Sequence, residues 1–282
     1  MTNGIARATP HADALRARLR VELSTGALEL PVLPNVAAAV LASSIDDQSD
    51  AARLADLIQQ DQSLAGHVLR VTNSPAFRGA TEIVALQQAI ARLGMERIRE
   101  IALSASLKGA LFRGGRYHGL AESAWQVALA SGLWAKEFAR AARRNVEIAY
   151  LCGLLHNIGV PVLAHRLGEL DESLSSTEAQ TLVEQFAPRA GVALARSWQL
   201  PDPVVAAIEH VAEPAAAGPH AAAVAVAACG VAVARWMIER SLLVADVVKL
   251  PAVAQLNLYP EDVEGILERK EGIRAAMESM VL

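Results

Sequence analysis

The feature that most constrains this chain is a helical pattern that runs through almost all of it. Alanine and leucine dominate its segments, and β-branched residues in alternation with polar ones are rare. Proline, glycine and Ser/Asp clusters divide the pattern into short pieces. Hydrophobic residues make up 53% of the 282 residues, enough for a large core. We therefore predict an all-α fold of closely packed helices.

Loop and capping residues indicate where these helices begin and end. Asp61 is a good N-cap for a helix that must stop before Pro75, with Leu64, Val68 and Val71 on one face. The helices expected in the first half span about 11–23, 35–44, 49–61, 62–74, 85–94 and 95–112, with Gly94 as a left-handed C-cap. The helices expected in the second half span about 120–142, 146–157, 177–186, 189–199, 202–212, 220–239 and 261–279.

The stretch RGGRYHG, from Arg113 to Gly119, interrupts the helical pattern. It places glycines among charged residues, a composition that is typical of a connecting loop. We therefore predict two packed helical parts. The first is an N-terminal bundle of residues 1–113, and the second comprises residues 114–282.

Bulk composition argues against several classes of partner. The net charge of −4 and the aromatic content of 4% are unlike those of nucleic-acid-binding proteins. Cys152 and Cys229 lie in apolar runs, which indicates reduced, buried thiols and a cytoplasmic protein. The N-terminal residues lack the apolar segment of a signal peptide. The alanine-rich segment Ala221–Ile238 contains Arg235, so we expect a buried helix and no membrane partner.

The stretch GLLHNIG, from Gly153 to Gly159, carries the clearest chemical signal. A histidine followed by aspartate at such a position would form half of a metal site, but His156 is followed by Asn157. Gly159 and Pro161 come next, so the pair is expected in the last turn of a helix, where backbone carbonyls lack partners. Imidazole and amide N–H groups can donate to such carbonyls. The sequence therefore favours a structural role for both residues.

A longer pattern surrounds this stretch. It consists of Leu30-Pro31, Leu33-Pro34, LADLIQQDQSLAGHVLRVTNSPAF, IVALQQAIARLGMERIREIAL, AYLCGLLHNIG and GVALARSWQLPDPVVAAIEH. Through these residues the chain resembles the HDOD family, the HD-related output domains of bacterial signalling proteins. The resemblance implies an N-terminal helical bundle packed on a C-terminal part like the HD superfamily, whose metal phosphohydrolases use His and Asp ligands.

The resemblance also allows a comparison with the ligand positions of metal-binding relatives. Val127 stands where those relatives have a first histidine, Asn157 replaces the aspartate, and Ala187 falls at a further histidine position. His156 is retained, and of the final pair of histidines in those relatives only His210 remains, because Val211 stands at the second position. A divalent ion in an apolar pocket needs charge compensation, which an amide does not supply. We therefore predict no functional metal site, no cofactor and no catalytic residue.

Two basic groups are candidates for a ligand or partner site. The first lies at the end of a long predicted helix, where it would also stabilise the helix dipole, and the second lies in the glycine loop. Their members are Arg140, Arg143 and Arg144, and Arg113, Arg116 and His118.

Three functions remain open from the sequence. The favoured one is a non-catalytic bacterial signal-transduction module that contacts proteins of two-component or cyclic-di-GMP networks through the groove between the two parts, beside RGGRYHG. The second is a divergent metal-dependent phosphohydrolase that uses His156, Asn157 and His210. The third is a receptor that binds a cyclic dinucleotide at the basic groups without hydrolysing it.

Overall fold

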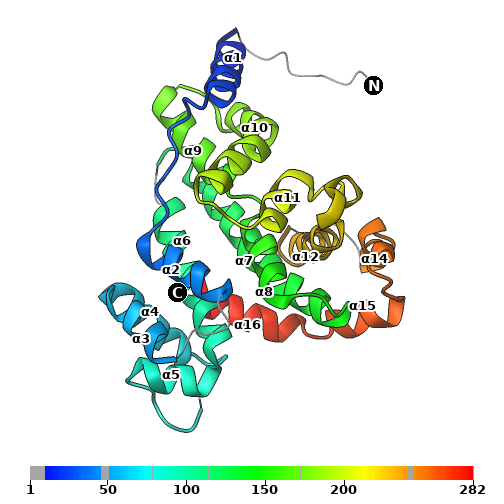
Figure 1. The fold of residues 1–282 in the computed structure, drawn as a ribbon. Helices are drawn as coiled ribbons and strands as arrows, with labels where there is room; N and C mark the ends of the chain where they lie inside the picture. Colours follow the sequence, from blue (N-terminus) through cyan, green and yellow to red (C-terminus); the bar gives the residue numbers. More distant parts are fainter. Residues whose placement is uncertain are drawn as a thin grey trace.

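The computed structural model describes residues 10–45, 51–77, 79–112, 115–171, 173–239 and 244–281. Within these ranges every regular element is a helix (Figure 1), which confirms the predicted all-α fold. In chain order the elements are α1 (Pro10–Thr25), α2 (Asn35–Ile45), α3 (Ala51–Gln59), α4 (Gln62–Thr72), α5 (Leu86–Leu93), α6 (Met95–Leu111), α7 (His118–Ala141), α8 (Val146–Leu155), α9 (Gly159–Leu170), α10 (Ser176–Ser197), α11 (Asp202–His210), the 3-10 helix η1 (Pro214–His220), α12 (Ala221–Glu239), α13 (Val244–Val248), α14 (Pro251–Gln255), α15 (Pro260–Leu267) and α16 (Lys270–Val281).

Helix α7 is the centre of the molecule, and α8 and α12 pack along it. Small residues let these three helices approach closely. A Cβ atom on Gly153 of α8 would lie 2.5 Å from the carbonyl oxygen of Ser131 in α7, and one on Gly230 of α12 would lie 2.7 Å from the same oxygen. The indole rings of Trp125 and Trp134, which also belong to α7, are fully buried. The glycines therefore allow the core helices to touch backbone to backbone.

Two helical stretches, 146–170 and 214–239, are long and apolar enough to cross a membrane by length and composition alone. Inside this fold, 72% of the apolar window of the first stretch and 50% of that of the second are buried. A helix at the core of a folded domain meets the same criteria. In the second stretch, residues 224–227 and 229–234 are buried, and α12 packs against α7 and α8.

Helices α2 to α6 form a bundle in which α6 is the longest member. The carboxylate of Asp61 caps α4 by accepting a hydrogen bond of 3.0 Å from the backbone N–H of Leu64, and Leu64, Val68 and Val71 are buried as expected. Gly94 ends α5 with φ of 84° and ψ of 156°. The positive φ favours glycine, but the extended ψ differs from the left-handed helical cap that the sequence predicts.

Helix α1 lies outside this bundle and packs against α10 (Figure 1). Its residue Glu22 accepts hydrogen bonds of 2.7 and 3.0 Å from the guanidinium group of Arg166 in α9. After α1, the indole N–H of Trp198 donates a hydrogen bond of 2.9 Å to the carbonyl oxygen of Pro31. Helix α1 belongs to the range 1–113 but thus packs on helices of the range 114–282. The predicted boundary itself falls in the chain between the end of α6 and the start of α7.

The predicted break at Pro188 is wrong. The ranges 177–186 and 189–199 form one helix, α10, with this proline inside it. Proline removes one helical N–H donor, but Ala187, Ala190 and Gly191 on either side of it are buried, and α10 packs along α9. Tertiary contact therefore carries the helix across the proline.

The sequence does not predict α9, and it predicts one helix where α15 and α16 lie. Gly159 and Pro161 indicate a helix end, yet both lie in the first turn of α9, where the N–H that proline lacks needs no helical partner. The range 261–279 is divided between α15, which ends at Leu267, and α16, which begins at Lys270.

Candidate functional site

The turn between α8 and α9 holds the candidate metal residues. Asn145 caps the start of α8 by accepting a hydrogen bond of 2.8 Å from the backbone N–H of Ile148. The helix ends at Leu155, so His156 and Asn157 directly follow its last turn. The short helix therefore delivers both side chains to the place where α7, α8 and α9 meet.

His156 is enclosed by protein and is 6% exposed. Its Nδ1 lies 2.7 Å from the carbonyl oxygen of Gly153. A carbonyl can only accept, so Nδ1 carries the proton of this bond. Burial lowers the pKa of His156 to about 4, so the imidazole is neutral at pH 7. Its Nε2 is buried and has no hydrogen-bond partner among the described residues.

Asn157 joins the turn to α7. Its Nδ2 donates a hydrogen bond of 2.8 Å to the carbonyl oxygen of Ala124. Its Oδ1 is buried and, within the described ranges, has no partner. Both residues thus donate to backbone carbonyls, His156 within its own helix end and Asn157 across to the central helix.

The other positions taken from the resemblance lie on the helices around this turn. Val127 is buried in α7, one turn after Ala124. Ala187 belongs to the part of α10 that touches the start of α9, because a Cβ on Gly159 would lie 1.9 Å from its carbonyl oxygen. His210 ends α11, has a side chain 32% exposed and lines an open groove, with its Nε2 4.0 Å from a carboxylate oxygen of Glu209.

These residues do not fit a divalent metal ion. Around the turn, the acceptors without partners are one imidazole nitrogen and one amide oxygen, and both are uncharged. Val127 and Ala187 have no ligating side-chain atom. In the part of the chain that the structure describes, no three His, Cys, Asp or Glu side chains form a metal-binding group. A divalent ion would lack charge compensation here, so we derive no reaction step through a metal.

The predicted basic groups lie at opposite ends of α7. Arg116 and His118 are at its start, where Arg116 lies over the ring of Tyr117, and Arg113 lies outside the described residues. Arg140, Arg143 and Arg144 are at its end. A helix of 24 residues is about 36 Å long, so the two groups do not share one site.

The arginines at the end of α7 also differ among themselves. Arg140 forms ion pairs with Glu137 and with Glu96, at 3.8 Å for the second pair. Arg143 has a φ of 53° and lies with Arg144 in the exposed turn before α8. Arg140 is therefore part of the protein's own ionic contacts, and two exposed side chains remain of this group.

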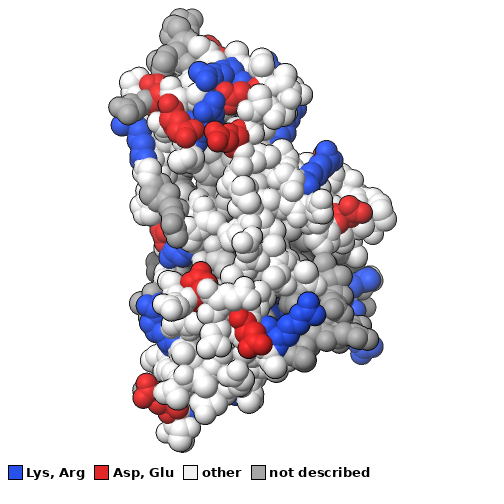
Figure 2. All heavy atoms as spheres, turned by 60° about the vertical axis from the view of Figure 1, so that its left-hand side comes forward, with Lys and Arg blue, Asp and Glu red and all other residues white. Residues whose placement is uncertain are grey.

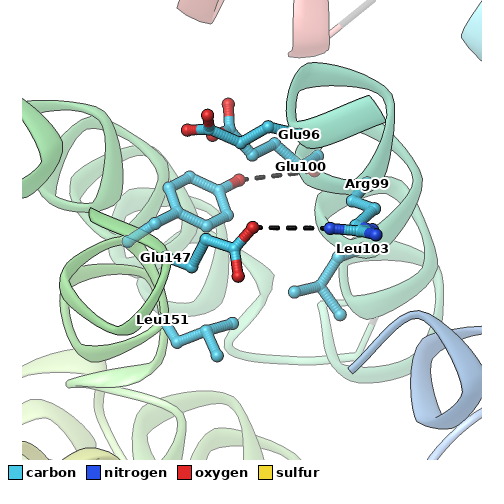
Figure 3. A pocket seen from close by; sticks show the side chains of 7 residues that line it. Glu96, Arg99, Glu100, Leu103, Glu147 and Leu151 are labelled. Atoms are coloured by element: carbon cyan, nitrogen blue, oxygen red, sulfur yellow. Dashed lines mark hydrogen bonds and ion pairs between the residues drawn. The ribbon is translucent and has the colours of Figure 1, made fainter. Parts of the chain in front are cut away.

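A buried ionic cluster, which the sequence analysis misses, joins α6 to α7. The side chain of Lys136 in α7 is 3% exposed, and its Nζ contacts the carboxylates of Glu100 and, at 2.9 Å, Glu96. Figure 3 shows Glu96 and Glu100 side by side on α6. Burial raises the pKa of Glu100, and the positive charge of Lys136 opposes that rise. The cluster ties the N-terminal bundle to the central helix.

Helix α8 adds to the same contact. The hydroxyl of Tyr150 donates a hydrogen bond of 3.3 Å to the carbonyl oxygen of Glu100, and the guanidinium of Arg99 lies 3.4 Å from the carboxylate of Glu147 (Figure 3). The cavity among these side chains has a volume of about 20 Å³, room for one water molecule. The signal available in the sequence is the four-residue spacing of Glu96 and Glu100 on α6.

A groove of about 850 Å³ separates the N-terminal bundle from the C-terminal helix. It runs between α2, α4, α6 and the end of α16. Phe112, which directly precedes the glycine loop, lines it together with Lys108, Arg70 and His67. Burial, with the nearby charges of Arg70 and Lys108, lowers the pKa of His67. This groove is of a size that holds small ligands or a segment of another protein.

The described residues define the class of this protein as an all-helical domain, with the turn at His156 and Asn157 between two of its core helices. The family model of the HDOD domain matches residues 30–214. The chain belongs to the HDOD domain family.

Solved structures agree with this fold. An HDOD domain protein of unknown function from Geobacter sulfurreducens is 22% identical with a TM-score of 0.75, over 95% of this chain and 99% of that one. A Shewanella amazonensis protein provisionally named a metal-dependent phosphohydrolase is 20% identical with a TM-score of 0.73, over 96% of this chain and 100% of that one. A Marinobacter aquaeolei protein provisionally named a signal transduction protein is 24% identical with a TM-score of 0.66, over 99% of this chain and 68% of that one.

A curated relative is longer than this chain. An uncharacterized protein of Treponema pallidum is 25% identical over 189 residues, which are 63% of this chain and 36% of that protein. The aligned residues thus span about a third of the relative's length.

Proposed function

We propose that this protein is a non-catalytic signal-transduction module of the bacterial cytoplasm that acts by binding other proteins. The proposal rests on the hydrogen bonds that the side chains of His156 and Asn157 make to the backbone. His156 and Asn157 donate to the carbonyl oxygens of Gly153 and Ala124, and in the described part of the chain no group of three His, Cys, Asp or Glu side chains could complete a metal site with them. The provisional name of the Marinobacter aquaeolei relative supports a signalling role. Components of two-component or cyclic-di-GMP networks are the partners we expect.

The groove between α2, α4, α6 and α16 is the surface we assign to a partner. It lies where the N-terminal bundle meets the C-terminal helix, next to the glycine loop. Its lining includes apolar side chains such as Val36 and Met280 as well as the basic Lys108 and Arg70. Such a mixture suits a protein segment, because apolar contacts supply affinity and the charges set orientation.

The experiment fills this groove and leaves the rest of the surface unchanged. Partners are captured with the wild-type protein, produced in pure form, and their affinity is measured by calorimetry. Ala110→Trp places a large ring in the groove, and Ala254→Trp places the same ring on an exposed position of α14. We expect at least a tenfold loss of affinity for the first variant alone. Equal affinity of both variants for every partner would remove the groove from the proposal.

One observation favours a second function, a divergent phosphohydrolase. Nε2 of His156 and Oδ1 of Asn157 are buried acceptors without partners in the described ranges, and one solved relative carries a provisional phosphohydrolase name. Hydrolysis of phosphomonoesters and phosphodiesters is therefore measured with Mg²⁺ or Mn²⁺ added. Turnover that disappears in His156→Ala would establish the second function and refute the non-catalytic one.

A further inference from the structure

A second groove, with a volume of about 370 Å³, lies between α1 and α10. Its floor contains Leu23, Val192 and other small or apolar side chains. Arg20 of α1 and Arg189 and Arg196 of α10 also line it. Neither basic group considered in the sequence analysis contains any of these three arginines. We call this surface the arginine groove.

The two helices that form the arginine groove run in the same direction. Nε of Arg16 lies 3.0 Å from the side-chain oxygen of Gln185 at one end. Further along, the residues from Arg20 to Ser24 face those from Pro188 to Arg196. Arg189 and Arg196 are seven positions apart, which corresponds to about 10 Å along α10, and Arg20 lines the same groove from α1.

Three arginines and one carboxylate, that of Glu209, line the arginine groove, so its positive charge is only partly balanced. Elsewhere on α1, Arg16 pairs with Asp13, and Arg18 pairs with Glu22 at 3.0 Å. Arg20, Arg189 and Arg196, by contrast, have no carboxylate within 4.0 Å among the described residues. Figure 2 shows charged residues of both signs gathered at the upper end of the molecule, where α1 and α9 lie. In the described ranges, acidic residues on this end of the fold therefore form ion pairs with other arginines and not with the three arginines of the groove.

The arginine groove continues into a third groove, between α10, α11 and η1, with a volume of about 730 Å³. The two share Arg196 and Glu209 in their linings. The lining of the third groove includes the apolar Leu200, Val205 and Ala217, and also the carboxylates of Asp202 and Glu209. A path of this length and composition exceeds the needs of a single phosphate group. No Phe, Tyr or Trp lines either groove, so stacking of nucleic-acid bases has no platform there.

We infer that the arginine groove binds an acidic segment of a partner protein, in which apolar side chains alternate with carboxylates. The carboxylates would pair with Arg20, Arg189 and Arg196, because guanidinium groups bind carboxylates with two parallel hydrogen bonds. The apolar side chains would cover the floor from Leu23 to Val192. This inference rests on the proposed role in protein binding and adds the chemistry of the partner.

The test uses the full chain and a defined probe. The probe is a fluorescein-labelled peptide of twelve residues, eight glutamates and four leucines, and its binding is followed by anisotropy at low salt. A peptide with glutamine in place of glutamate is the probe control. We expect the acidic peptide to bind, the glutamine peptide to bind at least tenfold more weakly, and added salt to weaken the acidic peptide further.

Matched variants locate the binding. Arg196→Glu reverses one charge in the arginine groove, and Lys249→Glu makes the same reversal at an exposed position after α13. We expect about a tenfold loss for Arg196→Glu, a larger loss when Arg189→Glu is added, and no loss for Lys249→Glu. Thermal unfolding followed by circular dichroism verifies that both variants fold. Equal affinity of the Arg196→Glu and Lys249→Glu proteins, or tripolyphosphate that binds as tightly as the peptide, would overturn the inference.

Failure of this inference is distinguishable from failure of the proposed function. A captured partner that binds Arg196→Glu as tightly as wild type, together with absent peptide binding, refutes the arginine groove and leaves protein binding intact. Metal-dependent turnover, in contrast, refutes the non-catalytic role and leaves the peptide measurement unaffected.

Discussion

Removal of the Lys136 charge should destabilise the folded protein strongly. The side chains of Lys136 and Glu100 are 3% and 5% exposed, so neither charge is screened by water. Lys136→Met keeps the length of the side chain but leaves the Glu100 carboxylate with Arg97, at 3.0 Å, as its nearest cation. Breaking a buried ion pair on one side costs about 3–5 kcal/mol. Because Arg97 remains, we expect a loss at the lower end, about 3 kcal/mol in the free energy of unfolding.

The double variant Lys136→Met/Glu100→Met separates the charge effect from packing. Apolar replacement of both partners of a buried pair is often neutral, so we expect recovery to within about 1 kcal/mol of wild type in urea unfolding.

The single variant also has a predicted pH dependence. Burial raises the pKa of Glu100 in the folded state, and loss of Lys136 raises it further. The folded carboxyl then gains its proton at a higher pH than the unfolded one, so the loss is full at pH 8 and smaller at pH 5. A single-variant loss below about 1 kcal/mol, or a double variant as unstable as the single one, would refute this reasoning.

Two further perturbations test the packing around the turn. Gly159→Ala would place a Cβ 1.9 Å from the carbonyl oxygen of Ala187, so α9 and α10 must separate, and we expect a loss of about 3 kcal/mol in the free energy of unfolding. Gly168→Ala is the control, because its Cβ would lie 3.6 Å from its nearest neighbour, and it should change the free energy of unfolding by less than about 1 kcal/mol. Equal urea midpoints for these variants would contradict the close approach. His156, with a pKa of about 4, stays neutral when folded while the unfolded chain binds a proton below about pH 6.5, so stability falls from pH 6.5 to pH 4. His156→Gln should show a shallower fall, and parallel curves would argue against the buried neutral imidazole.

Sequence reasoning performs best where the signals are local. The N-cap of Asp61 and the buried stripe of Leu64, Val68 and Val71 depend on a single helix, and the structure contains both. The family resemblance likewise rests on residue types at fixed spacing, and the family model confirms it. The all-α fold is confirmed for the same reason, because helix-forming segments without period-two alternation leave few other architectures.

Errors arise where distant contacts override local signals. Pro188 breaks a helix in isolation, yet it lies within α10 because the surrounding residues are buried against α9. Gly159 indicates a helix end, but its role is to let the backbone of α9 reach Ala187. The position of α1 on α10 cannot be predicted from the periodicity of α1, because that periodicity shows an apolar face and not the surface that covers it.

The candidate site divides in the same way. The replacement of ligand types at Val127 and Asn157 follows from the sequence once the family pattern is known, and so does the place of His156 at a helix end. Pairing of Lys136 with Glu100 joins residues 36 positions apart, which spacing alone does not reveal. The two predicted basic groups, finally, are separated by the whole length of α7, a distance that the predicted length of this helix already implies.

The metal content of the purified protein shows whether the turn at His156 and Asn157 holds a divalent ion. The protein is produced in medium that contains manganese, iron and zinc, purified without chelators, and analysed by mass spectrometry of the elements, with His156→Ala as the reference. We predict far less than one divalent ion per chain, and the same content in both proteins, because the turn at His156 and Asn157 offers two uncharged acceptors and no carboxylate. One or more ions per wild-type chain, lost in His156→Ala, would contradict the account.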